Sequence, residues 1–74
     1  MDTINFYKQL AQILDVEEVK PHDALKDFES WDSLAILSVL AFADSKYGVT
    51  VKAEEIRSVG SVAELANLVE AKRK

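Results

Sequence analysis

The sequence predicts an all-α fold, a small bundle of three longer helices and one short helix. Apolar residues recur at intervals of three and four in the first and last segments, and capping residues stand ahead of each long apolar segment. The alternation typical of a strand is confined to Val49 and Val51. A chain of 74 residues fits one domain, 1–74, built around one core.

The first predicted helix begins at Asp2 or Thr3, either of which can cap it, and ends near Asp15. Its apolar positions are Ile4, Tyr7, Leu10, Ala11 and Leu14, and Phe6 and Ile13 widen the stripe. The three-four spacing of these positions predicts that one face of the helix lies against the core.

A connection from about Val16 to Trp31 follows, and it contains the only proline, Pro21. A connection of this length is unusual in so small a domain, and is either functional or packed down by its own side chains. We expect its isolated apolar residues Leu25 and Phe28 to anchor it to the core.

The most apolar segment begins at Asp32–Ser33. It contains Leu34, Ala35, Ile36, Leu37, Val39, Leu40, Ala41, Phe42 and Ala43, interrupted only by Ser38. A continuous apolar run is compatible with a buried strand, but its length, its Leu and Ala content and its capping residues favour a helix. We expect this helix to continue to about Lys46 and to be closed by Gly48.

Two further helices are predicted in the last third of the chain. Lys52 to Arg57 can form a short helical turn that carries Ile56. Ser61 and Glu64 have the spacing of a capping box, in which the serine accepts from the Glu64 N–H while the glutamate reaches back. The helix that follows has apolar residues at Val62, Leu65, Leu68 and Val69.

Composition excludes several classes of function. The absence of Cys excludes disulfides and thiolate metal sites, and a single histidine, His22, weighs against an imidazole metal site or a Ser-His-Asp triad. We therefore predict that the protein binds no metal ion, has no catalytic residue and is not an enzyme. The net charge of −4 argues against nucleic acid, and no apolar run approaches the roughly 20 residues of a membrane span. A cytoplasmic monomer is expected.

The tripeptide Asp32-Ser33-Leu34 is the motif that carries chemistry. Asp32, or Ser33 itself, can accept bonds from the first-turn N–H groups, and we expect Leu34 to turn inward as the first core residue, leaving Ser33 in solvent. A helix N-terminus favours an anionic group, so the Ser33 oxygen is suited to carrying a phosphodiester. With no general base evident near it, Ser33 is not predicted to be a catalytic nucleophile.

An Asp-Ser-Leu tripeptide opening the second helix of an acidic, Cys-free chain of this size resembles the acyl carrier proteins. The resemblance covers essentially the whole chain. It includes the acidic segment Asp15–Val19, the later Leu25, the Tyr47–Val51 link, and the spacing of Ile56, Val59, Val62, Leu65 and Val69. It implies a four-helix fold of that type and a 4'-phosphopantetheine arm attached to Ser33, within a motif formed with Asp32 and Leu34.

The resemblance also implies function and partners. The arm would hold acyl or aminoacyl groups as thioesters and carry them between biosynthetic enzymes of a fatty acid, polyketide or other specialised pathway. The implied partners are a phosphopantetheinyl transferase and the acyl- or aminoacyl-loading and condensing enzymes.

Two departures from the family concern the docking surface. Phe28–Trp31 stands where the family has Leu-Gly, and the outward positions of the second helix are apolar or small where carriers of fatty acid synthesis are acidic. This favours a specialised pathway. The predicted partner-binding residues are Trp31, Ala35, Ile36, Ser38 and Phe42.

Three rival functions remain at this stage. The main one is a cofactor-free helical interaction module that docks partners through the apolar second helix. A small helix-turn-helix nucleic-acid binder and a hydrolase built on Ser33 are disfavoured by the acidic balance and by the missing base, respectively.

Overall fold

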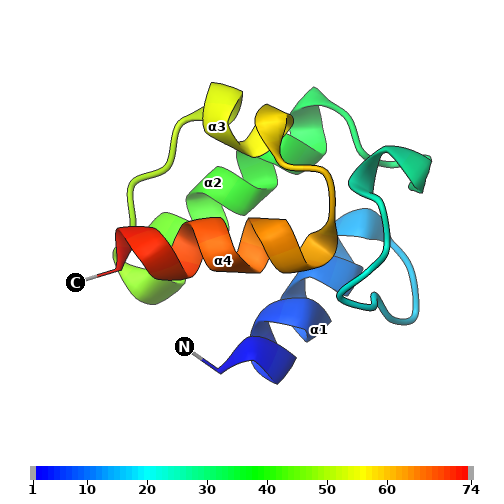
Figure 1. Ribbon diagram of the computed structural model, residues 1–74, viewed down its shortest axis with the longest axis horizontal. Helices are drawn as coiled ribbons and strands as arrows, with labels where there is room; N and C mark the ends of the chain where they lie inside the picture. The colour runs from blue at the N-terminus through cyan, green and yellow to red at the C-terminus, as the bar shows by residue number, and fades with distance from the viewer. Residues whose placement is uncertain (1, 74) are drawn as a thin grey trace.

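The computed structural model describes residues 2–73 and is all-helical (Figure 1). The elements are α1 (Thr3–Leu14), a 3-10 turn (Leu25–Asp27), α2 (Ser33–Tyr47), α3 (Ala53–Ser58) and α4 (Val62–Lys72). Within residues 2–73 extended pairing is limited to one isolated bridge, Ala24 with Ser61. α1 packs against α2 and α4, and α3 packs against α2. The predicted bundle of three longer helices and one short helix is confirmed.

α1 begins and ends with an aspartate. The Asn5 N–H donates to Asp2 Oδ1 at 3.3 Å, and Asp15 closes the helix in the left-handed conformation, with φ 58°. The buried positions are Phe6, Leu10, Ala11 and Leu14. Ile4, predicted to lie on the core face, is 68% exposed, because the buried face is centred on Phe6 and Leu10.

α2 is a helix as predicted, capped by Asp32 and closed by Gly48. Gly48 adopts a φ of 67°, a left-handed conformation that favours glycine over side-chain-bearing residues. The buried residues of this helix are Ala35, Ile36, Val39 and Ala43. Three of them follow one another at intervals of four, so a single row of small and β-branched side chains faces the core.

The long connection is anchored by side chains, as predicted. Leu25 is 1% exposed and Val19 is 7% exposed, and Phe28 is half-buried against the core. The prediction that Leu25 and Phe28 hold this segment down is therefore confirmed, and Val19 is an additional anchor.

The connection is also bonded through its backbone to the start of α4. Leu25 N–H donates to Gly60 O at 3.0 Å, Val62 N–H to Asp23 O at 3.0 Å, and Ala63 N–H to Pro21 O at 2.8 Å. Two of these donors belong to the first turn of α4, where N–H groups lack intrahelical acceptors. Residues 21–25 thus supply hydrogen-bond acceptors for the N–H groups at the start of α4. The same bonds fix the path of the connection.

α4 starts at the predicted cap. Glu64 N–H donates to Ser61 Oγ at 3.2 Å, and the serine hydroxyl donates to Glu64 Oε1 at 3.3 Å. The return bond therefore runs between the two side chains, whereas a capping box would return to the Ser61 backbone. The residues of α4 that face the core are Val62, Leu65, Ala66 and Val69.

The fully buried residues of the core are apolar, and the Tyr47 hydroxyl is buried beside them without a hydrogen-bond partner in residues 2–73. Among residues 2–73 no polar or charged residue is buried. Phe6 lies at its aromatic centre, with ring centroids 5.8 Å from Phe42 and 6.3 Å from Tyr47. Burial raises the pKa of the Tyr47 hydroxyl above its ordinary value, with a smaller contribution from Asp2. No helix in residues 2–73 has the length and apolar character needed to cross a membrane.

Leu25→Ala is expected to lower the free energy of unfolding by about 2–4 kcal/mol, because it opens a cavity under the connection. Leu34→Ala, at a side chain that is 73% exposed, is the control and should change stability by less than about 0.5 kcal/mol. Urea unfolding followed by far-UV circular dichroism measures both. A Leu34→Ala loss as large as that of Leu25→Ala would contradict the burial pattern.

Candidate functional site

The candidate site is the N-terminal turn of α2. Asp32, in an extended backbone conformation, caps the helix: its Oδ1 accepts from Ala35 N–H at 3.0 Å and its carbonyl accepts from Ile36 N–H at 3.0 Å. A turn closed by Trp31 N–H donating to Phe28 O at 3.0 Å leads the chain into this cap. The carboxylate of Asp32 is thus occupied by the helix, and the next residue, Ser33, is exposed.

The surroundings of Ser33 fit a phosphodiester. Its side chain is exposed on the first residue of a 15-residue helix, and its hydroxyl makes no hydrogen bond with any residue from 2 to 73. The N-terminal end of a helix carries a partial positive charge and N–H groups without intrahelical acceptors, which favours an attached phosphate. The negative charge of the neighbouring Asp32 carboxylate would repel such a phosphate. The hydrogen bond from Ala35 N–H, however, holds this carboxylate against the helix backbone.

The structure positions no base for Ser33. His22 is exposed on the connection and has no hydrogen bond or ion pair within residues 2–73, so nothing there orients its ring. A serine nucleophile needs a base within hydrogen-bonding reach and a group that holds that base. Within the same residues no three His, Asp or Glu side chains are grouped so as to hold a metal ion.

The prediction for Leu34 is wrong. It was expected to turn inward as the first core residue, but it is 73% exposed, and Leu37, one turn later, is 57% exposed. The reason is helical phase: the buried row runs through Ala35, Val39 and Ala43, and Leu34 lies about 100° away from it. Ser33 is exposed as expected, although the argument from an inward-facing Leu34 does not hold.

The predicted partner surface is also corrected. Ala35 and Ile36 are each 5% exposed, so they are packed into the core and are not available to a partner. Phe42 is half-buried against Phe6. Ser38 is exposed, and Trp31 is half-buried against the core.

The exposed apolar residues of α2 lie on another face. We call Leu34, Leu37 and Ala41 the α2 stripe: they are exposed and follow one another at intervals of three and four. A hollow of about 390 Å³ continues from the stripe, lined by Leu37, Leu40, Ala41, Asp44, Val49 and Val51. Sequence reasoning missed this face because α2 is apolar all round; the available signal was the row of small and β-branched residues Ala35, Val39 and Ala43 at intervals of four.

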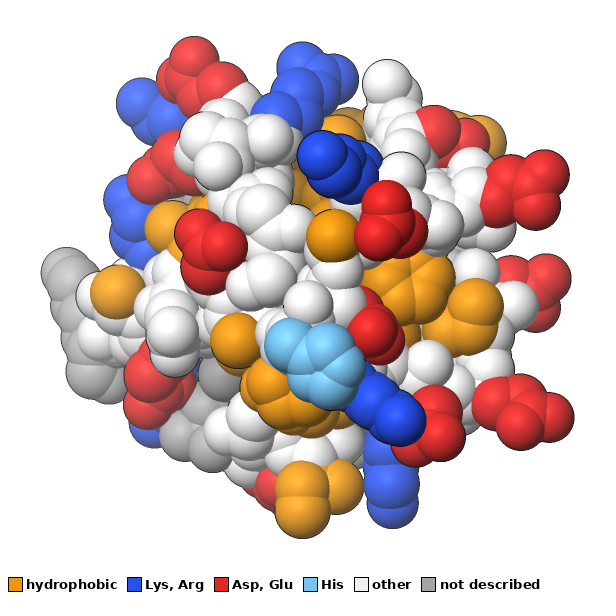
Figure 2. All heavy atoms as spheres, turned by 45° about the vertical axis from the view of Figure 1, so that its right-hand side comes forward, with side chains coloured by type: hydrophobic (Ala, Val, Ile, Leu, Met, Phe, Trp, Pro, Cys, Tyr) orange, Lys and Arg blue, Asp and Glu red, His pale blue; other side chains and the backbone are white. Residues whose placement is uncertain are grey.

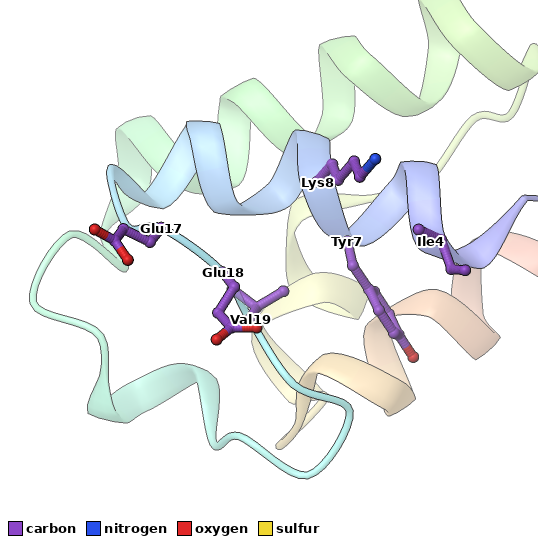
Figure 3. A pocket seen from close by; sticks show the side chains of 6 residues that line it. All are labelled: Ile4, Tyr7, Lys8, Glu17, Glu18 and Val19. Carbon is purple, nitrogen blue, oxygen red and sulfur yellow. The ribbon is translucent and has the colours of Figure 1, made fainter.

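A second hollow, of about 280 Å³, lies between α1 and the beginning of the connection (Figure 3). Its apolar lining is Ile4, Tyr7 and Val19, with Lys8, Glu17 and Glu18 at its edges. Figure 3 shows the side chains of Lys8 and Glu17 directed away from one another. The charged groups therefore do not converge on one point, and the hollow contributes nothing to the Ser33 site.

Charge is distributed unevenly over the surface. The exposed acids of the connection are Glu17, Glu18, Asp27 and Glu29. Figure 2, which turns this side of the molecule forward, shows acidic side chains gathered along its edge beside an apolar patch. Such a surface attracts a basic partner during encounter.

Neither models of known protein families, nor curated proteins, nor solved structures match this chain.

Asp32→Ala is expected to lower the free energy of unfolding by about 1 kcal/mol, since the Ala35 N–H loses its acceptor. Asp32→Asn is the matched control: the amide oxygen can still accept this bond, so most of the stability should remain. Thermal unfolding of the three proteins measures the difference. Equal losses in the two variants would show that Asp32 acts through its charge and not as a cap.

Proposed function

We propose that this protein is an acyl carrier protein and that Ser33 is its point of attachment for 4'-phosphopantetheine. The observation that carries the proposal is the exposed Ser33 hydroxyl at the capped start of α2, within an Asp-Ser-Leu tripeptide. The acidic, Cys-free composition and the all-helical fold support it.

Attachment would require a transferase, because the chain offers Ser33 no base of its own within residues 2–73. The Ser33 oxygen would attack the phosphorus of coenzyme A that bears the pantetheine. An oxygen–phosphorus bond forms, the pyrophosphate bond breaks, adenosine 3',5'-bisphosphate leaves, and the hydroxyl proton passes to a base of the enzyme. The exposure of Ser33 permits this approach, and the N-terminal end of α2 stabilises the product's negative charge.

When bound, the arm would supply a terminal thiol that holds acyl or aminoacyl groups as thioesters. The chain's own contribution is to hold the attachment point at a rigid helix end, fixed by Asp32 and by the turn at Trp31. A tethered group reaches each partner enzyme at a high effective concentration. The partners would be the transferase and the loading and condensing enzymes of a fatty acid, polyketide or other specialised pathway.

The α2 stripe supports an apolar docking mode for these partners. Leu34 is the residue after the attachment point, and Leu37 continues the stripe away from it. Contiguous exposed apolar side chains mark sites of protein–protein contact. The acids of the connection would steer a basic partner toward this end of the molecule.

The proposal is tested by intact mass after incubation with coenzyme A and a broad-specificity phosphopantetheinyl transferase. Wild type should gain one phosphopantetheine and Ser33→Ala none. Ser30→Ala is the matched control, because Ser30 is also exposed and lies three residues away; it should be modified like wild type. Modification of Ser33→Ala, or no modification of folded wild type by two different transferases, would overturn the proposal.

Leu37→Ser should lower the kcat/KM of the transferase for this chain by about tenfold, because one exposed leucine would no longer be buried at the interface. Ser38→Ala, an exposed neighbour on the same helix, is the control and should change it by less than about twofold. Initial rates of mass change at several protein concentrations measure both. Equal rates for the Leu37→Ser variant and wild type would remove the α2 stripe from the docking surface.

The second candidate function is a cofactor-free interaction module. Its support is the same exposed pair, Leu34 and Leu37, which would dock a partner without any arm. The two functions differ at Ser33. The interaction module tolerates Ser33→Ala and not Leu37→Ser, whereas the carrier tolerates neither.

A further inference from the structure

The short helix α3 is joined to the end of α4 by one ion pair. Lys72 Nζ lies 2.8 Å from Glu55 Oε2, and the two side chains are 41% and 28% exposed. In Figure 1, α3 lies at one edge of the bundle, and the extended segment that leads into it rises beside the C-terminal end of α4. Lys72 also lines a hollow with Tyr47, Gly48 and Thr50, which places it against the beginning of that segment.

The Glu55 carboxylate has two roles. While Oε2 faces Lys72, Oε1 accepts from Lys52 N–H at 3.0 Å, at the position that caps α3. The hydrogen bond from Lys72, and then that from Lys52 N–H, lower the pKa of Glu55 below its ordinary value. The first turn of α3 and its attachment to α4 therefore depend on the same side chain.

Apart from this pair, α3 is held mainly where it packs against α2. Of its six residues, Ala53–Ser58, only Ile56 is fully buried. A helix this short is not stable on its own, so it persists only while it is attached to the bundle. Segments with few buried apolar contacts are the first to open when a protein unfolds locally.

We propose that the Glu55–Lys72 pair is a clasp that controls the opening of α3. Release of the pair frees α3 from α4 and loosens its first turn, while α1, α2 and α4 stay packed. Opening exposes the apolar interior around Ile56 and Val51, which are 0% and 6% exposed when the clasp is closed. An acidic side chain of a partner that competes for Lys72 would release it. The opening of α3 by this clasp does not require an arm at Ser33.

Hydrogen exchange of the 74-residue chain, followed by NMR at neutral pH, tests the clasp. The probe is the Ile56 amide, which donates to Lys52 O at 3.2 Å within α3. Lys72→Met keeps most of the aliphatic chain and removes the charge. It should speed exchange at Ile56 by about two- to fivefold while the amides of Leu10 and Leu65 are unchanged.

The chain offers a matched control. Arg73 Nη1 lies 3.3 Å from Glu70 Oε2, an ion pair of similar exposure that stays within the end of α4 and its cap. Arg73→Met should leave exchange at Ile56 unchanged. Glu55→Gln removes the charge but keeps an oxygen for Lys52 N–H, so it should resemble Lys72→Met and add nothing further when the two are combined.

Salt gives an independent readout. Raising sodium chloride to about 0.5 M screens an exposed pair, so it should speed Ile56 exchange in wild type and not in Lys72→Met. Equal exchange at Ile56 in the Lys72→Met and Arg73→Met variants would overturn the clasp. A rise shared by Ile56, Leu10 and Leu65 in Lys72→Met would also overturn it, because it would mean global and not local unfolding.

Discussion

The backbone pairing between residues 21–25 and the start of α4 is the constraint on which the rest of this small protein depends. The chain has no cysteine, so apolar packing and hydrogen bonds fix the connection between α1 and α2; one of these bonds runs from Lys20 N–H to Asp23 Oδ2 at 2.8 Å. Two hydrogen bonds satisfy N–H groups in the first turn of α4, and a third, from Leu25 N–H to Gly60 O, holds the segment that carries Leu25. Once Leu25 is buried, only the turn at Phe28–Trp31 separates it from the cap of α2. The position of Ser33 follows from this chain of contacts.

Sequence patterns predicted the elements of this fold better than their orientation. Asp32 and Gly48 defined the two ends of α2, and Ser61 defined the start of α4, because caps act through local hydrogen bonds that are visible in sequence. The face that α2 buries was not predictable from apolar identity, since its apolar residues surround the helix. For this reason the apolar pattern predicts an inward Leu34, whereas in the structure Leu34 lies in solvent. The apolar residues of α1 likewise form two overlapping stripes. Tertiary packing buries the stripe that contains Phe6 and leaves Ile4 exposed.

Asp32 and Glu55 each stabilise a different part of the proposed carrier. Asp32 caps α2 and keeps its own charge bonded to the helix, which leaves the adjacent Ser33 hydroxyl accessible. Glu55 caps α3 and also ties it to Lys72. One end of the bundle thus holds a fixed attachment point, and the α3 edge is held by a surface pair of modest strength.

The proposed attachment places the arm on Ser33 and directs it outward from the start of α2. Phosphorus-31 and nitrogen–proton NMR spectra of the transferase-treated protein test it most directly. Attachment at Ser33 should give one phosphodiester resonance, amide shifts that are largest from Trp31 to Leu37, and unchanged amides in the core at Leu10 and Leu65. The absence of a phosphodiester resonance, or shifts centred on another helix start such as Ser61, would contradict it.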